Sequence, residues 1–158
     1  MNSMSASVNE QTEDTLPENP QALAELTARV MYANDPASQA LGMHIVSVAP
    51  GQASMSMPVR ADMLNGHKTC HGGFIFALAD SSFAFACNSR NAATVAAGCT
   101  IDYLAPAFEG DVLTANAAEY SLSGRTGVYD VQVTNQEGKR IAIFRGRSYR
   151  IKGQVVGD

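Results

Sequence analysis

The longest apolar stretch of the chain, residues 72–87, constrains the fold most, because a carboxylate stands at its centre. It reads GGFIFALADSSFAFAC, and Asp80 is followed directly by two serines. A carboxylate at the middle of a membrane costs about 2.5 kcal/mol or more. We therefore predict a buried helix of a soluble protein without a membrane segment. Because this helix is apolar nearly all round, other elements must cover most of its circumference.

The segments around this helix predict antiparallel strands. Apolar residues at 23, 26, 30 and 31 repeat at helical spacing and indicate a first helix, which ends near residues 34–36. Extended or alternating patterns then occupy residues 43–49 and 53–59 before the central helix, and residues 95–103, 111–122, 129–134 and 139–151 after it. This order predicts an α+β fold in which a curved antiparallel sheet wraps around the long central helix.

The length of 158 residues predicts a single domain. By composition, residues 1–18 form a disordered tail without features of a targeting signal, residues 19–153 form the domain, and residues 154–158 form a short tail. The three cysteines, an odd number, fit a reducing cytoplasm better than a disulfide-stabilised secreted module.

Charge is sparse. Charged residues make up 16% of the chain, against roughly 25% in an average soluble domain. We therefore expect part of the surface to be buried against another copy. A net charge of −4 argues against a nucleic-acid partner, which would require a basic surface.

Asp80 is the residue least expected in such a helix. On a helix it shares a face with apolar residues, namely Phe76, Ala77, Phe83, Ala84 and Cys87. Burial would raise its pKa towards the range that suits a general base. The alternative is a structural carboxylate, bonded to a local hydroxyl or to a partner loop.

The sequence His71-Gly72-Gly73 stands at the start of this helix. Two glycines let the backbone approach a ligand, and amides at a helix N-terminus can stabilise a developing oxyanion. Gly72 and Asp80 are eight residues apart, roughly 12 Å along a helix. One helix cannot bring both groups to one carbonyl, whereas two antiparallel copies could, so a site shared across a dimer is indicated. Alternatively, the glycines only form a tight loop.

Other residues allow further interpretations. His67, Cys70 and His71 could ligate zinc, but no second cluster completes a tetrahedral site, so no metal is predicted. Cys70 and His71 could form a nucleophile pair, although adjacent side chains diverge in an extended loop.

Three cations are also candidates for a site. Arg125, Arg145 and Arg147 could bind the phosphates of an anionic ligand or pair with carboxylates at a subunit contact.

Several blocks of the sequence resemble the hotdog-fold acyl-CoA thioesterases, and more narrowly their phenylacetate-degradation (PaaI-type) branch. The blocks are NGHKTCHGG at 65–73, LADSSFAFACNS at 78–89, CTIDYL at 99–104, TGVYD at 126–130 and FRGRS at 144–148. The resemblance covers roughly residues 28–153. It implies hydrolysis of an acyl-CoA to the free acid and CoA without a metal or cofactor, by a homodimer that pairs further into a tetramer.

The resemblance also implies roles for individual residues. The Gly72 amide would donate to the thioester carbonyl, Asn65 would assist that carbonyl or the water, and His71 would support the loop. Asp80 of the opposite subunit would activate water or attack directly. The substrate-binding residues expected beside these are Gly73, Thr100, Arg125, Arg145 and Arg147.

One departure from the family pattern concerns the water. Some relatives carry a hydroxyl on the strand after the helix, but residues 95–99 read VAAGC here and Thr100 is the first hydroxyl. Thr100 and Ser81 are the remaining candidates to orient a water.

The function expected is hydrolysis of (hydroxy)phenylacetyl-CoA or similar aryl-acyl-CoA thioesters. The alternatives are a 3-hydroxyacyl-CoA dehydratase-like activity and non-catalytic acyl-CoA binding.

Overall fold

A computed structural model describes residues 15–157 and confirms the predicted α+β order of elements. The elements are α1 (Pro20–Ala33), α2 (Pro36–Ala40), β1 (His44–Ala49), β2 (Gln52–Pro58), a 3₁₀ turn (Ala61–Met63), α3 (Gly72–Asn88), β3 (Ala92–Tyr103), β4 (Val112–Ser123), β5 (Thr126–Thr134) and β6 (Arg140–Gln154).

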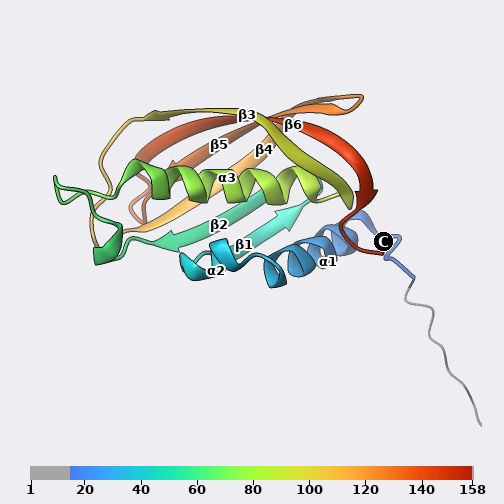
Figure 1. Ribbon diagram of the computed structural model, residues 1–158, viewed down its shortest axis with the longest axis horizontal. Helices are drawn as coiled ribbons and strands as arrows, with labels where there is room; N and C mark the ends of the chain where they lie inside the picture. Colours follow the sequence, from blue (N-terminus) through green and yellow to red (C-terminus); the bar gives the residue numbers. More distant parts are fainter. Residues whose placement is uncertain (1–14, 158) are drawn as a thin grey trace, which may run out of the picture.

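The strands of residues 15–157 form one antiparallel sheet of six strands, in the order β1-β2-β4-β5-β6-β3. The sheet curves around α3, as the sequence predicts, and α1 and α2 lie on the side of β1, away from β3 (Figure 1). The strand that follows α3 therefore does not pair with the strand that precedes it. β3 instead pairs with β6 and forms one edge of the sheet.

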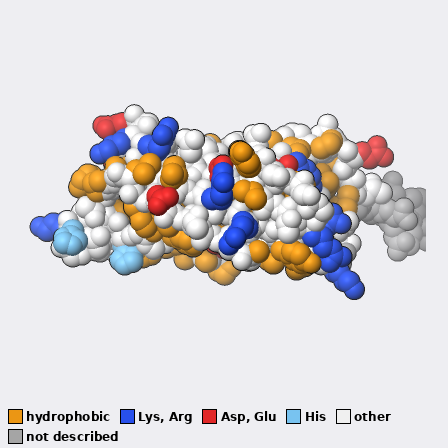
Figure 2. Space-filling model, turned by 90° about the horizontal axis from the view of Figure 1, so that it is seen from above, with side chains coloured by type: hydrophobic (Ala, Val, Ile, Leu, Met, Phe, Trp, Pro, Cys, Tyr) orange, Lys and Arg blue, Asp and Glu red, His pale blue; other side chains and the backbone are white. Residues whose placement is uncertain are grey.

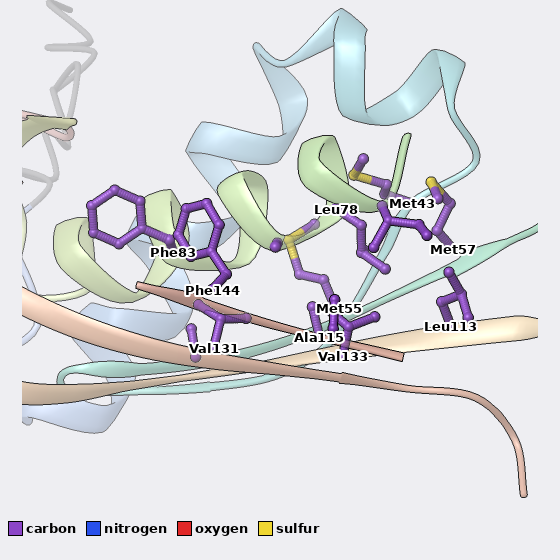
Figure 3. Close-up of a cluster of buried hydrophobic side chains, with 14 of the residues drawn as sticks. Met43, Met55, Met57, Leu78, Phe83, Leu113, Ala115, Val131, Val133 and Phe144 are labelled. Carbon is purple, nitrogen blue, oxygen red and sulfur yellow. The ribbon is translucent and has the colours of Figure 1, made fainter. Parts of the chain in front are cut away.

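The buried face of α3 packs on the concave side of the sheet. Met55, Leu78, Phe83, Val131 and Phe144 belong to this core and have at most 2% of their surface exposed (Figure 3). One polar side chain of α3 joins the helix to the sheet within this core. The buried Ser82 hydroxyl lies 3.0 Å from the carbonyl oxygens of both Ala53 and Ala115.

The opposite stripe of α3 is less covered than its composition suggests. Phe76, Ala77, Asp80 and Ala84 are half-buried, and they recur at helical spacing. The helix is apolar on nearly all sides, but the other elements of the chain cover only part of its circumference. Asp80 stands on the stripe that is left partly open.

The first helix is capped as its sequence indicates. The Asn19 side chain accepts hydrogen bonds from the Gln21 and Ala22 amides, and Asn34 is the C-cap. Its fully buried residues are nevertheless the small Ala24, Thr27 and Ala28, while the larger apolar residues of the predicted stripe are half-buried.

The structure describes only part of the two predicted tails. Most of the expected disordered tail, residues 1–14, lies outside the described residues, and 15–18 form no helix or strand. β6 continues one residue past the predicted boundary at 153, and Asn91 then accepts hydrogen bonds from the Val155 and Val156 amides. No helix between residues 15 and 157 is long and apolar enough to span a lipid bilayer.

Candidate active site

The two groups expected to act on a thioester lie on the same helix, as predicted. Gly72 is the first residue of α3, and Asp80 is its ninth. The rise of an α-helix places them about 12 Å apart. A single chain therefore presents the two groups at separate places, and neither can reach a carbonyl held by the other.

The backbone amides at the start of α3 differ in whether another described residue accepts their hydrogen bonds. The His71 ring accepts the Gly73 amide at Nδ1 over 3.0 Å, and the Phe74 amide donates to the His71 carbonyl oxygen over 3.0 Å. The Gly72 amide finds no acceptor among the residues that the structure describes. His71 therefore holds the first turn, and Gly73, expected to bind substrate, has its amide already engaged.

Tyr103 contacts Gly72 closely, although the sequence did not single it out for the site. Its hydroxyl donates to the Gly72 carbonyl oxygen over 2.9 Å. A Cβ atom on Gly72 would stand 2.9 Å from Cζ of the tyrosine ring, so a larger side chain at this position requires the ring or the helix to move. A cavity of about 490 Å³ opens beside this contact, lined by Thr69, Cys70, Gly72, Ile75, Tyr103, Leu104, Ala105 and Pro106.

Asp80 is half-buried, and burial raises the pKa of its carboxyl group. Cys99 on β3 opposes this rise through a contact of 3.9 Å between its Sγ and Oδ1 of Asp80. No hydroxyl bonds to the carboxylate within the described residues: the Ser81 hydroxyl lies 2.9 Å from that of Ser38, and Ser82 donates to the sheet. Within residues 15–157, the alternative of a local hydroxyl partner for Asp80 is therefore not found.

Thr100 does not stand where the water-orienting hydroxyl was expected. Side chains alternate between the two faces of a strand, so Cys99 and Thr100 project to opposite faces. Thr100 is exposed, pairs with Arg145 across the strands and lines an outer cleft with Asp102 and Asp130. Within one chain it cannot orient a water at Asp80. Within one chain, the neighbouring thiol of Cys99 stands beside Asp80 instead.

Asn65 organises the loop that precedes α3. Its Oδ1 atom accepts hydrogen bonds from the His67 amide at 2.9 Å and from the amide and hydroxyl of Thr69 at 3.3 and 3.2 Å. Its Nδ2 atom has no partner among the described residues. The side chain thus holds the loop through its oxygen and keeps two N–H donors for a ligand.

Cys70 is not set up as a nucleophile. It is buried, its thiol lies 3.7 Å from the His71 carbonyl oxygen, and burial raises its pKa to about 11. A thiol with this pKa is almost fully protonated at neutral pH. Between residues 15 and 157, no three His, Cys, Asp or Glu side chains are arranged to hold a metal ion.

The three predicted arginines occupy different surroundings. Arg145 forms a bidentate pair with Asp130, at 2.6 and 2.8 Å, and stacks over Tyr120. Arg147 lies against Gly98 of β3. Both project from the exposed face of β6, as their spacing predicts. Figure 2 looks at the molecule from the side of β3 and β6, where cationic side chains lie among exposed apolar ones.

Arg125 lies apart from these two, in the hairpin between β4 and β5. It lines a cleft of about 370 Å³ together with Arg90, Asn91, Arg150 and Lys152. Arg90 is already paired with Glu119 across 2.6 Å. The described residues show no ion pair for Arg125, Arg150 or Lys152.

Known proteins are similar to this chain in sequence. The chain matches the Thioesterase superfamily over residues 67–142. It is 51% identical over 131 residues to the acyl-coenzyme A thioesterase PaaI of Escherichia coli, a match that covers 83% of this chain and 94% of that protein.

Solved structures of thioesterases have a similar fold. The structure of the E. coli PaaI protein from the phenylacetic acid degradation operon matches with a TM-score of 0.85 and 49% identity, over 86% of this chain and 99% of that one. A hypothetical thioesterase protein of Streptococcus pneumoniae, crystallised with coenzyme A, matches with a TM-score of 0.67 and 28% identity, over 71% and 91% of the two chains.

The family resemblance seen in the sequence is thus confirmed along most of the chain, by sequence and by fold. The chain belongs to the Thioesterase superfamily and, within it, to the PaaI-type branch of the hotdog-fold acyl-CoA thioesterases.

Proposed function

We propose that this enzyme hydrolyses phenylacetyl-CoA, its ring-hydroxylated forms or similar aryl-acyl-CoA thioesters to the free acid and CoA, in the cytoplasm and without a metal or cofactor. The observation that carries the proposal is a half-buried carboxylate without a cationic partner in the described chain, on the same helix as a free amide. The substrate class is supported by the E. coli relative, which is an acyl-coenzyme A thioesterase from the phenylacetic acid degradation operon.

In the proposed reaction, the Gly72 amide donates to the thioester carbonyl oxygen and stabilises the negative charge that develops on it. Asp80 of the opposite subunit removes a proton from a water whose oxygen attacks the carbonyl carbon, or the carboxylate attacks this carbon itself. In either case the C–S bond breaks and CoA leaves as a thiolate, which takes up a proton. After direct attack, water hydrolyses the anhydride formed with Asp80 and releases the free acid. Asn65 supplies an N–H donor to the carbonyl or the water, and His71 keeps the first turn of α3 in place.

The active form is a homodimer, because the two groups on one helix are about 12 Å apart. The edge strand β3 supports this proposal. Its first nine residues, 92–100, carry no charge, and Ala96 and Ala97 are exposed. An uncharged edge strand readily pairs with another strand. A second copy joined along β3 would bring two α3 helices close together, and two such dimers would form the expected tetramer.

The anionic part of CoA requires cations. Arg125, together with Arg150 and Lys152, lines a cleft without a carboxylate, so phosphates could bind there. Arg147 stands beside β3 and is the second candidate. Arg145 contributes less, because its guanidinium is held by Asp130.

A panel of aryl, branched and straight-chain acyl-CoAs, assayed for free CoA with a thiol reagent, tests the function. Asp80→Asn should lower turnover by about 10²–10⁴-fold while the protein stays folded. Asp102→Asn is the matched control, since this exposed carboxylate stands on the outer face of β3.

Three results would overturn the assignment. The first is substantial remaining hydrolysis by Asp80→Asn. Dehydration of a 3-hydroxyacyl-CoA without CoA release would favour the dehydratase alternative. Tight binding of CoA esters without thiol release would favour a non-catalytic binding protein.

A further inference from the structure

The strand β3 presents its thiol to the carboxylate on which the proposed function rests. Cys99 and Asp80 come from different elements, and their Sγ and Oδ1 atoms are 3.9 Å apart. Both side chains are half-buried, so the contact is partly removed from water. This contact is the sole hydrogen bond of the Asp80 carboxyl group within residues 15–157.

We propose that Cys99 is a positioning residue for Asp80: its thiol donates a hydrogen bond to the carboxylate and holds it in one orientation for work on water or on the thioester. The inference rests on the proposed thioesterase function. On the strand after the helix, the Cys99 thiol thus contacts Asp80, whereas the Thr100 hydroxyl, the first on that strand, projects to the opposite face.

The electrostatics of the pair agree with this donor and acceptor. Burial raises the pKa of the Cys99 thiol, and the charge of Asp80 raises it further, while Arg147 lowers it. The thiol thus keeps its proton at neutral pH and remains a donor, if a weak one. In return, the hydrogen bond from Cys99 lowers the pKa of Asp80 against the effect of burial.

Few other titratable groups face this pair. Cys87 lies seven residues after Asp80 on α3, but its thiol lies 3.5 Å from the Ala84 carbonyl oxygen and burial raises its pKa to about 12. The charge of Asp80 also raises the pKa of Cys87, so this thiol is neutral at the pH of an assay, and no hydrogen bond joins it to Asp80 within the described residues. Cys87→Ala is thus a matched control that removes a thiol of the same region.

The test compares Cys99→Ala, Cys99→Val and Cys99→Ser with the wild type. The first two remove the donor, and valine suits a strand if alanine destabilises the fold. Serine restores a donor. Loss of the donor should lower kcat by about 3- to 10-fold, with little change in KM. It should also move the acid limb of the kcat/KM profile to higher pH, while Cys99→Ser and Cys87→Ala stay near the wild type.

A second measurement does not depend on activity. The carboxyl carbon of Asp80 can be followed by ¹³C NMR during an acid titration and assigned by its loss in Asp80→Asn. Its titration should move to higher pH in Cys99→Ala and Cys99→Val, and return in Cys99→Ser. An unchanged Asp80 titration in both donor-free variants would overturn the inference, and so would a serine variant as impaired as alanine.

The two hypotheses fail differently. A wild-type enzyme that releases no CoA from any ester contradicts the proposed function, while the NMR titration still decides whether Cys99 acts on Asp80. Wild-type hydrolysis that depends on Asp80 but is unaffected by loss of the Cys99 thiol retains the function and removes the positioning role.

Discussion

The hydroxyl of Tyr103 and the carbonyl oxygen of Gly72 are hydrogen-bonded over 2.9 Å, and the same tyrosine ring fills the space where a Gly72 side chain would stand. A residue at the end of β3 therefore fixes the first residue of α3 in two ways. The bond orients the peptide group that follows Gly72, and the ring occupies the space that a Cβ atom would need.

Gly72→Ala should therefore impair catalysis. Its Cβ would meet the Tyr103 ring at 2.9 Å, so the ring or the Gly72 backbone must move, and a shift of the backbone would displace the amide from the substrate carbonyl. Loss of one oxyanion donor costs about 10²–10³-fold in kcat, and we expect a loss at the lower end. Gly66→Ala, in the same loop region, is the control, because nothing lies within 4 Å of its Cβ position. Equal kcat values for the two variants would contradict this account.

A site shared by two chains predicts complementation between inactive variants. Asp80→Asn keeps the Gly72 amide, and Gly72→Ala keeps the carboxylate. A hybrid dimer of the two has one intact site and one site that lacks both groups, so it should show about half of the wild-type activity. Co-expression with two different tags, followed by an assay of the doubly purified protein, measures it. Activity no higher than that of the parent variants would place both groups of each site in one chain.

Stability should also depend on Asp80, in the direction opposite to activity. Burial raises its pKa in the folded protein, so the folded state prefers the protonated form. This preference stabilises the fold fully below the ordinary carboxyl pKa of about 3.9, and the contribution is lost as the pH rises through the higher folded value.

Asp80→Asn should accordingly raise the melting temperature at pH 7, and the gain should shrink as the pH falls towards 4. Calorimetry or thermal denaturation at several pH values measures it, with Asp102→Asn as the control that shows no such gain. A melting temperature at pH 7 that is lower in Asp80→Asn than in the wild type would contradict the prediction.

Gly146 on β6 is required for packing rather than for chemistry. A Cβ at this position would stand 2.8 Å from the ring of Phe83, which also packs against Tyr129 and Phe144. Gly146→Ala should destabilise the protein by about 1–3 kcal/mol, the usual cost of overpacking a core. Urea unfolding measures this loss against Gly66→Ala, and an unchanged midpoint would show that the ring can move aside.

The helices and strands were largely predictable from local patterns. The central helix begins at Gly72, as expected, because the His71 side chain caps its first turn. It ends at Asn88, close to the end of the apolar run. The stripe of α1 was predicted less well. Large apolar residues mark its sequence, but the residues it buries fully are Ala24, Thr27 and Ala28. Small side chains let elements approach closely, and a hydrophobic pattern gives them little weight.

The partners of the site residues were not predictable in the same way. Asp80 and Gly72 stand out by their types and spacing, whereas Cys99 and Tyr103 look like ordinary members of an alternating strand. Their importance depends on β3 lying at the edge of the sheet, where it pairs with β6 and runs beside α3. That order arises from long-range pairing, which no local pattern contains.

The two contacts between α3 and β3 match in length. Gly72 and Asp80 are eight residues apart on a helix, about 12 Å, and their partners Tyr103 and Cys99 are four residues apart on a strand that runs the opposite way, about 13 Å. Eight residues of the helix α3 and four residues of the strand β3 thus cover nearly the same distance, so both contacts can form at once. A single-residue insertion or deletion between 99 and 103 would turn one partner to the other face of the sheet. Evolution can therefore exchange side chains along this span, but changes in length must fall in the loops outside it.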